Sequence, residues 1–190
     1  LKSGSSNKMH QESYLAPWLI KRGDYDIALL QNSSGLEPLW PTGYYSTDPD
    51  IDPMSQNTRM AKLIHQYNPK CQIYQEQTWA SPRNGDDYVE SKWLVERGYA
   101  DNSNNRMKVL DELIEIYYVE LLKREPSIIV SRVGRAFPNS RNAGMSDLFH
   151  TDHHHPNNNG GYLKACTNCV TITGKPLQNA PTFDGISAEN

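Results

Sequence analysis

Three short apolar segments alternate with segments of helical periodicity along this chain. The apolar segments cover residues 25–31, 71–75 and 127–133, and each has the length of a buried β-strand. Consecutive parallel strands need a crossover connection, which is usually a helix. The alternation therefore predicts an α/β domain with a mainly parallel sheet.

Helical spacing of apolar residues marks the segments between and after the strands. The predicted helices cover residues 55–67, 86–98, 105–124 and 159–174. Asn-Pro and Glu-Pro pairs end the first and third of them, as expected for helix-stopping sequences. Residues 134–155 are polar and contain several Asn and Ser, so we expect a long loop there. In a parallel sheet, sites form beyond the carboxyl ends of the strands, which points to the loops that follow them.

The bulk properties bound the function classes. The chain of 190 residues fits one domain, which we place at residues 1–176, followed by a tail at 177–190. A formal net charge of −3 gives no general attraction for nucleic acid. No apolar stretch approaches the roughly 20 residues needed to cross a bilayer. No signal peptide is visible, and the chain starts without Met, so we expect a processed or truncated start.

The cysteines do not form a disulfide scaffold. There are three, and two of them, Cys166 and Cys169, have CxxC spacing within the last predicted helix. A zinc site needs further ligands, and no second CxxC exists. Packing or one incidental disulfide is the favoured interpretation over a redox or zinc role.

The most reactive side chains lie in a histidine-rich block. Four of the six histidines fall between His150 and His155, with Asp152 among them. One interpretation is a metal site, although adjacent side chains do not readily converge on one ion. Another is a solvated loop without a role. The third is acid–base chemistry, because an Asp three residues before a His can accept its Nδ1–H and leave Nε2 as a base.

Several segments together resemble the SGNH (GDSL-like) hydrolases, in particular the DUF4886 branch. The C-terminal D-x-x-H-P block, followed by G-x-Y-L, is present as Asp152 to Pro156 and Gly160 to Leu163. Further upstream lie similar pieces in the expected order: GSSNKMH from Gly4, YDIALLQ from Tyr25, TWA from Thr78 and VGRA from Val133. The resemblance covers roughly residues 4–176. It implies a three-layer α/β/α, flavodoxin-like fold.

The resemblance also implies a mechanism. A serine attacks an ester carbonyl, His155 removes the serine proton, and Asp152 orients the histidine. Backbone and side-chain donors stabilise the oxyanion. By position these donors are the Gly4 amide and the side chain of Gln31, with Asn32 as the second candidate.

The implied substrate is an ester, with an acyl group on a carbohydrate as our specific expectation. Trp79 and Tyr162 are the predicted substrate contacts. The aromatic residues Trp40, Tyr44, Tyr45 and Trp79 either stack on sugar rings or pack within the protein. No cofactor and no metal are expected.

The serine block of the family has no counterpart here. Only three residues precede Gly4, and Ser3, Ser5 and Ser6 follow no apolar strand. The strand that carries the serine would be central in the sheet, so its absence would leave apolar surface and backbone groups unpaired. Either an N-terminal companion fragment supplies that strand, or the sequence is partial, or the fold has lost its activity. We favour the first two because Asp152 and His155 are present.

Three classes of function remain open. The chain is either a hydrolase whose serine lies elsewhere or a non-catalytic binding or structural module on the same scaffold. The histidine block leaves a metal-binding protein as the third alternative. By resemblance alone, we expect a secreted or periplasmic protein.

Overall fold

A parallel three-stranded sheet forms the centre of the computed structural model, which describes residues 18–32, 37–43, 52–145 and 147–178. The strands are β1 (Ile27–Gln31), β2 (Gln72–Glu76) and β3 (Ile128–Ser131), in the order β1-β2-β3. Both pairs are parallel and in register, with Leu29 opposite Tyr74 and Tyr74 opposite Ile129. The predicted α/β class with a parallel sheet is confirmed.

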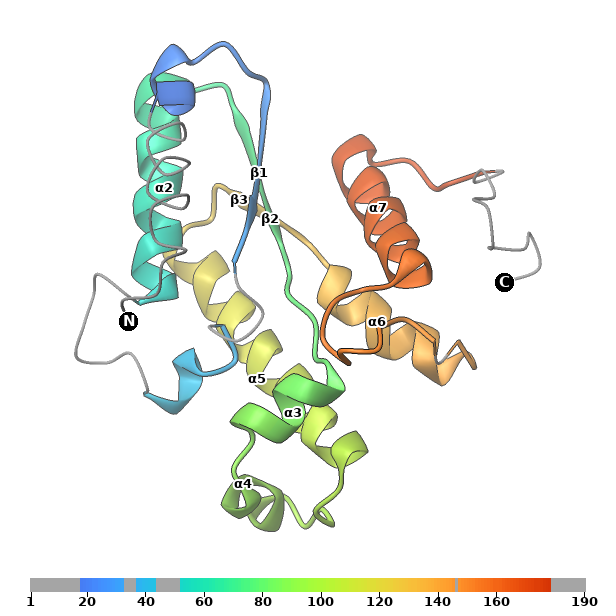
Figure 1. Cartoon of the computed structure of the whole chain (residues 1–190). Helices are drawn as coiled ribbons and strands as arrows, with labels where there is room; N and C mark the ends of the chain where they lie inside the picture. The colour runs from blue at the N-terminus through green and yellow to red at the C-terminus, as the bar shows by residue number, and fades with distance from the viewer. Residues whose placement is uncertain (1–17, 33–36, 44–51, 146, 179–190) are drawn as a thin grey trace, which may run out of the picture.

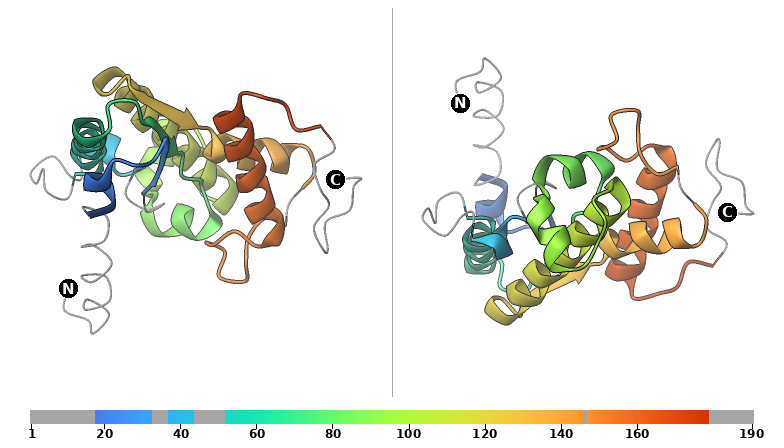
Figure 2. Two further views of the ribbon diagram at one scale, coloured as in Figure 1. Left: turned by 90° about the horizontal axis from the view of Figure 1, so that it is seen from above. Right: turned by 90° about the horizontal axis from the view of Figure 1, so that it is seen from below.

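Helices lie on both sides of this sheet. Along the chain they are α2 (Pro53–Tyr67), α3 (Pro82–Tyr88), α4 (Ser91–Glu96), α5 (Ser103–Arg124), α6 (Val133–Asn142) and α7 (Asn158–Thr173), with a short 3-10 helix, η1 (Trp40–Thr42). Figure 1 shows α2 and α7 on opposite sides of the strands, and the view from above in Figure 2 agrees. The arrangement is that of a flavodoxin-like α/β fold.

The apolar core lies between one face of the sheet and α2 and α5. Ile73 and Ile128, which point to this face, are 0% and 2% exposed. Tyr117, Tyr118 and Leu121 of α5 are fully buried against it. Burial of these large side chains supplies the main stabilisation of the domain.

The opposite face of the sheet is covered only in part. Strand side chains alternate between faces, so Glu76 and Ser131 point to the face where α7 lies. The side chains of Ile27 and Leu29 on β1 share that face and remain 42% and 46% exposed. The expectation of a buried strand at residues 25–31 was therefore wrong, since Ala28 and Leu30 on the other face of β1 are only half-buried.

Three predicted elements differ from the structure. The helix expected at 86–98 is divided into α3 and α4, because Val89 has an extended backbone and ends α3. The long polar loop expected after Gly134 begins instead with α6, which starts at Val133 and contains Pro138. The strand expected to reach Val133 ends at Ser131. Proline inside a helix removes one hydrogen bond, so Pro138 argued against a helix when only the sequence was considered.

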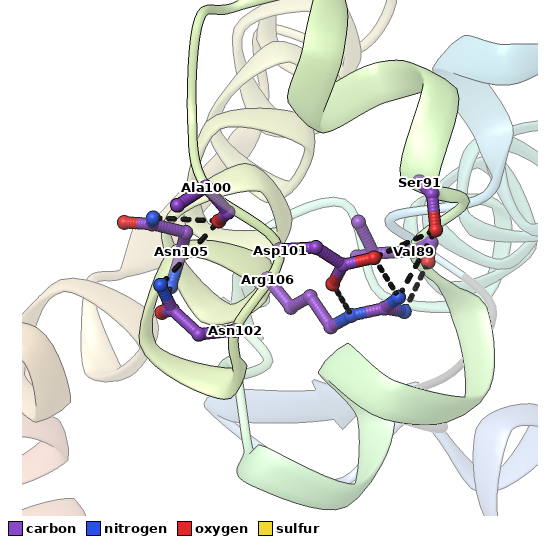
Figure 3. A network of polar contacts seen from close by, with 7 residues as sticks. All are labelled: Val89, Ser91, Ala100, Asp101, Asn102, Asn105 and Arg106. Atoms are coloured by element: carbon purple, nitrogen blue, oxygen red, sulfur yellow. Dashed lines mark hydrogen bonds and ion pairs between the residues drawn. The ribbon is translucent and has the colours of Figure 1, made fainter.

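Arg106 joins α4 to the start of α5. Its guanidinium donates to both carboxylate oxygens of Asp101 at 2.7 and 2.9 Å, to the Val89 carbonyl at 2.6 Å and to the Ser91 hydroxyl at 3.3 Å. Figure 3 shows these contacts beside the Asn102 side chain, which caps α5. One side chain thus ties the carbonyl after α3 and the first residue of α4 to α5.

Candidate active site

A small closed loop presents the histidine block. Its two sides meet at an antiparallel bridge between Phe149 and Pro156. The His150 amide donates to the His155 carbonyl at 2.8 Å, and the Asn157 amide donates to the Leu148 carbonyl at 3.0 Å. The Asn157 side chain then caps α7 by accepting from the Gly160 amide. The loop is thereby anchored directly to the start of a helix.

Asp152 organises the tip of this loop. Its Oδ1 accepts the backbone amides of His154 and His155, both at 3.0 Å. Its Oδ2 lies 2.5 Å from Nδ1 of His155. The structure therefore brings together the two residues for which acid–base roles were predicted, although the roles themselves are untested.

The electrostatics of the pair follow from these contacts. The hydrogen bond from His155 holds the pKa of Asp152 well below its usual range, with the two backbone amides adding to the effect. An ionised Asp152 only accepts, so Nδ1 of His155 carries a proton, and in the neutral form of the imidazole Nε2 is the acceptor. The His155 side chain is 67% exposed. The ring can thus meet a reacting group from solvent.

His154 is a site residue that sequence reasoning missed. Its ring lies edge-on against that of His155, with centroids 4.6 Å apart, and its Nδ1 is 3.5 Å from the Ser81 hydroxyl. Burial, followed by the charge of His155, lowers the pKa of His154. Ser81 is fully buried, and its hydroxyl also accepts the Asn84 amide as the cap of α3. We therefore interpret it as a packing contact for His154. No spacing rule would have paired residues 81 and 154.

The predicted oxyanion donors diverge. Gln31 is exposed at the carboxyl end of β1, on the sheet face that α7 shares. The Asn32 side chain lies with Glu37 and Tyr117, on the other side of the strand. Gly4 lies outside the described residues. No hydrogen bond joins Gln31 or Asn32 to His155 within the described part of the chain, so both assignments stay predictions.

Trp79 is buried. It is 5% exposed, its ring is stacked on Phe137 with centroids 5.4 Å apart, and the Lys164 ammonium lies 5.0 Å from its ring. Trp40 also packs, edge-on against Tyr117. The packing alternative therefore describes both residues, and the open ring face that sugar stacking requires is lacking at Trp79. Tyr44 and Tyr45 lie outside the described residues.

Tyr162, the second predicted substrate contact, lies in the first turns of α7. It is half-buried, and burial, with a hydrogen bond to Cys166, raises its pKa. Cys166 and Cys169 lie on α7, as predicted, and both are free thiols. A substrate contact at Tyr162 is untested.

A polar cluster holds α7 against the sheet beside this site. Glu76, at the end of β2, is 2% exposed and pairs with the Lys164 ammonium at 2.8 Å. The Asn168 side chain bridges the two neighbouring strands: its amide donates to Glu76 at 2.6 Å and its carbonyl accepts from the Ser131 hydroxyl at 2.6 Å. This cluster was not foreseen, because its polar strand residues look solvent-facing in the sequence.

A buried carboxyl group lies on the opposite side of β2. Glu37 is fully buried, and both of its oxygens lie 2.7 Å from the Tyr118 hydroxyl. That hydroxyl is also 2.9 Å from the Glu76 carbonyl. Burial raises the pKa of Glu37 to about 8, although hydrogen bonds oppose the shift. Glu37 is thus a neutral acid at pH 7 that links α5 to the end of β2.

The described residues offer no group of three or more His, Cys, Asp or Glu side chains that could hold a metal ion. In the same ranges, none of the helices is long and apolar enough to cross a membrane.

Comparisons with known proteins place the fold. No protein-family model matches the sequence, and no curated protein matches it. Among solved structures, a DUF4886 family protein from Bacteroides uniformis ATCC 8492 matches with a TM-score of 0.63 and 14% identity. The match covers 90% of this chain and 60% of the other, so this chain corresponds to little more than half of that protein. On this evidence the chain has the fold of a DUF4886 family protein.

Proposed function

We propose that this chain forms the acid–base part of an SGNH-type serine ester hydrolase, with acyl esters of carbohydrates as the specific substrate class. The observation that carries the proposal is the 2.5 Å contact between Asp152 Oδ2 and His155 Nδ1. It leaves Nε2 of an exposed imidazole ready to take a proton from a hydroxyl nucleophile. The carbohydrate part rests on the family resemblance alone.

The proposed roles make use of the geometry of the pair. His155 removes the serine proton and later returns it to the leaving alcohol, while Asp152 stabilises the imidazolium formed between these steps. The Gln31 amide and the Gly4 backbone N–H are the proposed oxyanion donors. Gln31 is the better of the two side-chain candidates, because Asn32 lies with Glu37 and Tyr117.

The nucleophile in this proposal is supplied by a strand beside β1. Among the described residues, no serine hydroxyl is bonded to His155, and β1 has a strand neighbour on one side only. Ile27 and Leu29 of β1, the strand at this open edge, are exposed on the partly uncovered face of the sheet. A strand paired with β1 would end beside Gln31, at the same edge of the sheet as the histidine loop. We propose an N-terminal companion segment as its source, and export from the cytoplasm as the setting.

A fluorophosphonate probe, which labels activated serines, tests the proposal on the native protein in its longest form. We expect one labelled serine and hydrolysis of acylated sugars. His155→Ala should remove the labelling and lower turnover by about 10³-fold or more. His150→Ala is the matched control in the same loop, because His150 is exposed and its side chain makes no hydrogen bond to Asp152.

The outcomes separate the alternatives. A homogeneous protein in which no serine is labelled would contradict the hydrolase and favour a binding or structural module. Stoichiometric metal in the purified protein, lost on mutation of the histidines, would favour a metal-binding role instead. If a serine is labelled and the protein hydrolyses simple acyl esters but not acylated sugars, the proposed reaction stands and the proposed carbohydrate substrate is wrong.

A further inference from the structure

The peptide unit between His154 and His155 is held from two directions. Its N–H, on His155, donates to Asp152 Oδ1 at 3.0 Å. Its carbonyl, on His154, accepts from Nε1 of Trp79 at 3.3 Å. Because a peptide unit is planar and rigid, fixing both ends fixes its rotation. That rotation sets where the His155 side chain leaves the backbone.

The loop needs such support because its backbone is strained. His153 has φ = 55°, a left-handed conformation that non-glycine residues rarely adopt. Its carbonyl accepts from the Arg83 amide at 3.2 Å. Two successive carbonyls of the loop are therefore held, one by Trp79 in the segment between β2 and α3 and the other by Arg83 in the first turn of α3.

Trp79 itself cannot easily move. Its ring is stacked on Phe137 with an interplanar angle of 13°, and the Lys164 ammonium lies over it. Lys164 is fixed in turn by the buried carboxylate of Glu76. A buried indole N–H needs an acceptor, and the His154 carbonyl is the one that it has. The sheet end, α6 and α7 thus all determine the position of one hydrogen-bond donor.

We propose that Trp79 is a positioning residue, which orients the His155 imidazole toward Asp152 through the His154 carbonyl. This role replaces the substrate contact first predicted for Trp79. The inference rests on the proposed function for the use of His155 as a base, but the geometry it explains is that of the Asp152–His155 pair. Without the indole N–H, the peptide unit would rotate, and both the His155 amide and Nδ1 would lose their alignment with the carboxylate.

The test removes the N–H while it keeps the shape of the ring. Site-specific replacement of Trp79 in the full chain by benzothienylalanine, in which sulfur replaces the indole N–H, leaves the stack on Phe137 intact. We expect the His155 backbone amide to exchange with solvent about 10-fold faster, as for the loss of one hydrogen bond. Nitrogen-15 spectra should show a loss of the Nδ1-protonated form of His155. The same replacement at Trp93, on α4, is the matched control and should leave both signals unchanged.

The readouts separate this inference from the proposed function. A lower melting temperature with unchanged His155 exchange and tautomer would show that Trp79 only packs, and would overturn the inference. If the replacement of Trp79 changes both His155 signals but the fluorophosphonate probe labels no serine even in the native protein, the positioning role stands and the hydrolase proposal fails. If the replacement abolishes serine labelling while both His155 signals stay unchanged, the positioning role fails and the hydrolase proposal stands.

Discussion

At the scale of single residues, the site depends on contacts of very different sequence separation. The Asp152–His155 contact joins residues three apart, so the spacing alone was enough to predict that they meet. The burial of Trp79 depends on Phe137 and Lys164, which lie 58 and 85 positions further along the chain. No local pattern carries that information, which is why the sequence left both a substrate contact and packing open for Trp79.

Two adjacent glycines at the start of α7 provide a sharp test of local packing. A Cβ on Gly160 would lie 2.3 Å from the Leu148 carbonyl and 2.9 Å from Pro156, whereas a Cβ on Gly161 would meet nothing within 4 Å. We expect Gly160→Ala to lower the free energy of unfolding by about 1–3 kcal/mol through overpacking.

Gly161→Ala should instead raise the free energy of unfolding by up to about 1 kcal/mol, because alanine favours the helix. Urea unfolding of both variants measures the difference. Equal effects of the two substitutions would show that α7 is not packed against Leu148 as described. Since Leu148 and Pro156 flank the histidine loop, Gly160→Ala should also broaden the His155 signals in NMR spectra.

At the scale of elements, most of the fold could be predicted and the exceptions have physical causes. Strands β1, β2 and β3 and helices α2, α5 and α7 agree with the predictions to within a few residues, because each has clear apolar periodicity or a clear stop. Helix α6 was missed since Gly134 and Pro138 both disfavour helices. Gly134 is needed there: a Cβ would lie 2.0 Å from the Thr78 carbonyl. The packing that requires this glycine made the helix hard to predict.

The junction between α4 and α5 depends on Arg106. Its side chain is 17% exposed and makes contacts to three different residues, whereas Arg124, near the end of the same helix, is 47% exposed and pairs with Glu120. We expect Arg106→Ala to lower the melting temperature by about 3–6 °C, because it leaves the Val89 carbonyl and Asp101 without this donor.

Arg124→Ala is the control and should lower the melting temperature by about 1–2 °C, because it removes an exposed ion pair with Glu120 and a contact of the guanidinium with the Trp40 ring. Thermal unfolding followed by circular dichroism checks both values. A smaller effect of Arg106→Ala than of Arg124→Ala would contradict the role of Arg106 at this junction.

At the scale of the whole molecule, two buried carboxyl groups should each contribute less to stability as the pH rises from acid to neutral. Burial raises the pKa of Glu37 to about 8 and that of Asp111 to about 7. Between the ordinary carboxyl values and these values, the folded protein binds more protons than the unfolded chain does. The contribution of both groups is therefore fully present at low pH and is lost as the pH rises through about 7 to 8. Other groups add their own dependence, so a variant is needed to isolate one of them.

Glu37→Gln isolates the contribution of one of these carboxyl groups. Glutamine keeps the shape and cannot ionise, so the variant should show a weaker decline in the free energy of unfolding between pH 5 and about 8 than the native protein. At pH 8 and above it should be at least as stable. Urea unfolding across this range measures both. Glu96→Gln, at an exposed position, should keep the native slope; an unchanged slope in Glu37→Gln would mean that Glu37 is not held neutral.

The sheet as a whole was predictable in class but not in coverage. The alternation of strands and helices predicted a parallel sheet, and helices do lie on both sides of it. Which face stays open was not predictable, because the apolar run of β1 is the same for a covered and an uncovered strand. The exposed Ile27 and Leu29 were identified only from the arrangement of α7.

The two oxygens of Asp152 make different contacts, but both belong to one carboxylate, so a change at this residue affects both. One orders the tip of the loop by accepting two amides, and the other holds the imidazole. Protonation or substitution of this carboxylate would undo the shape of the loop and the orientation of the ring in a single step. The alignment of the imidazole and the order of the loop tip thus depend on the same carboxylate, and a change at Asp152 affects both together.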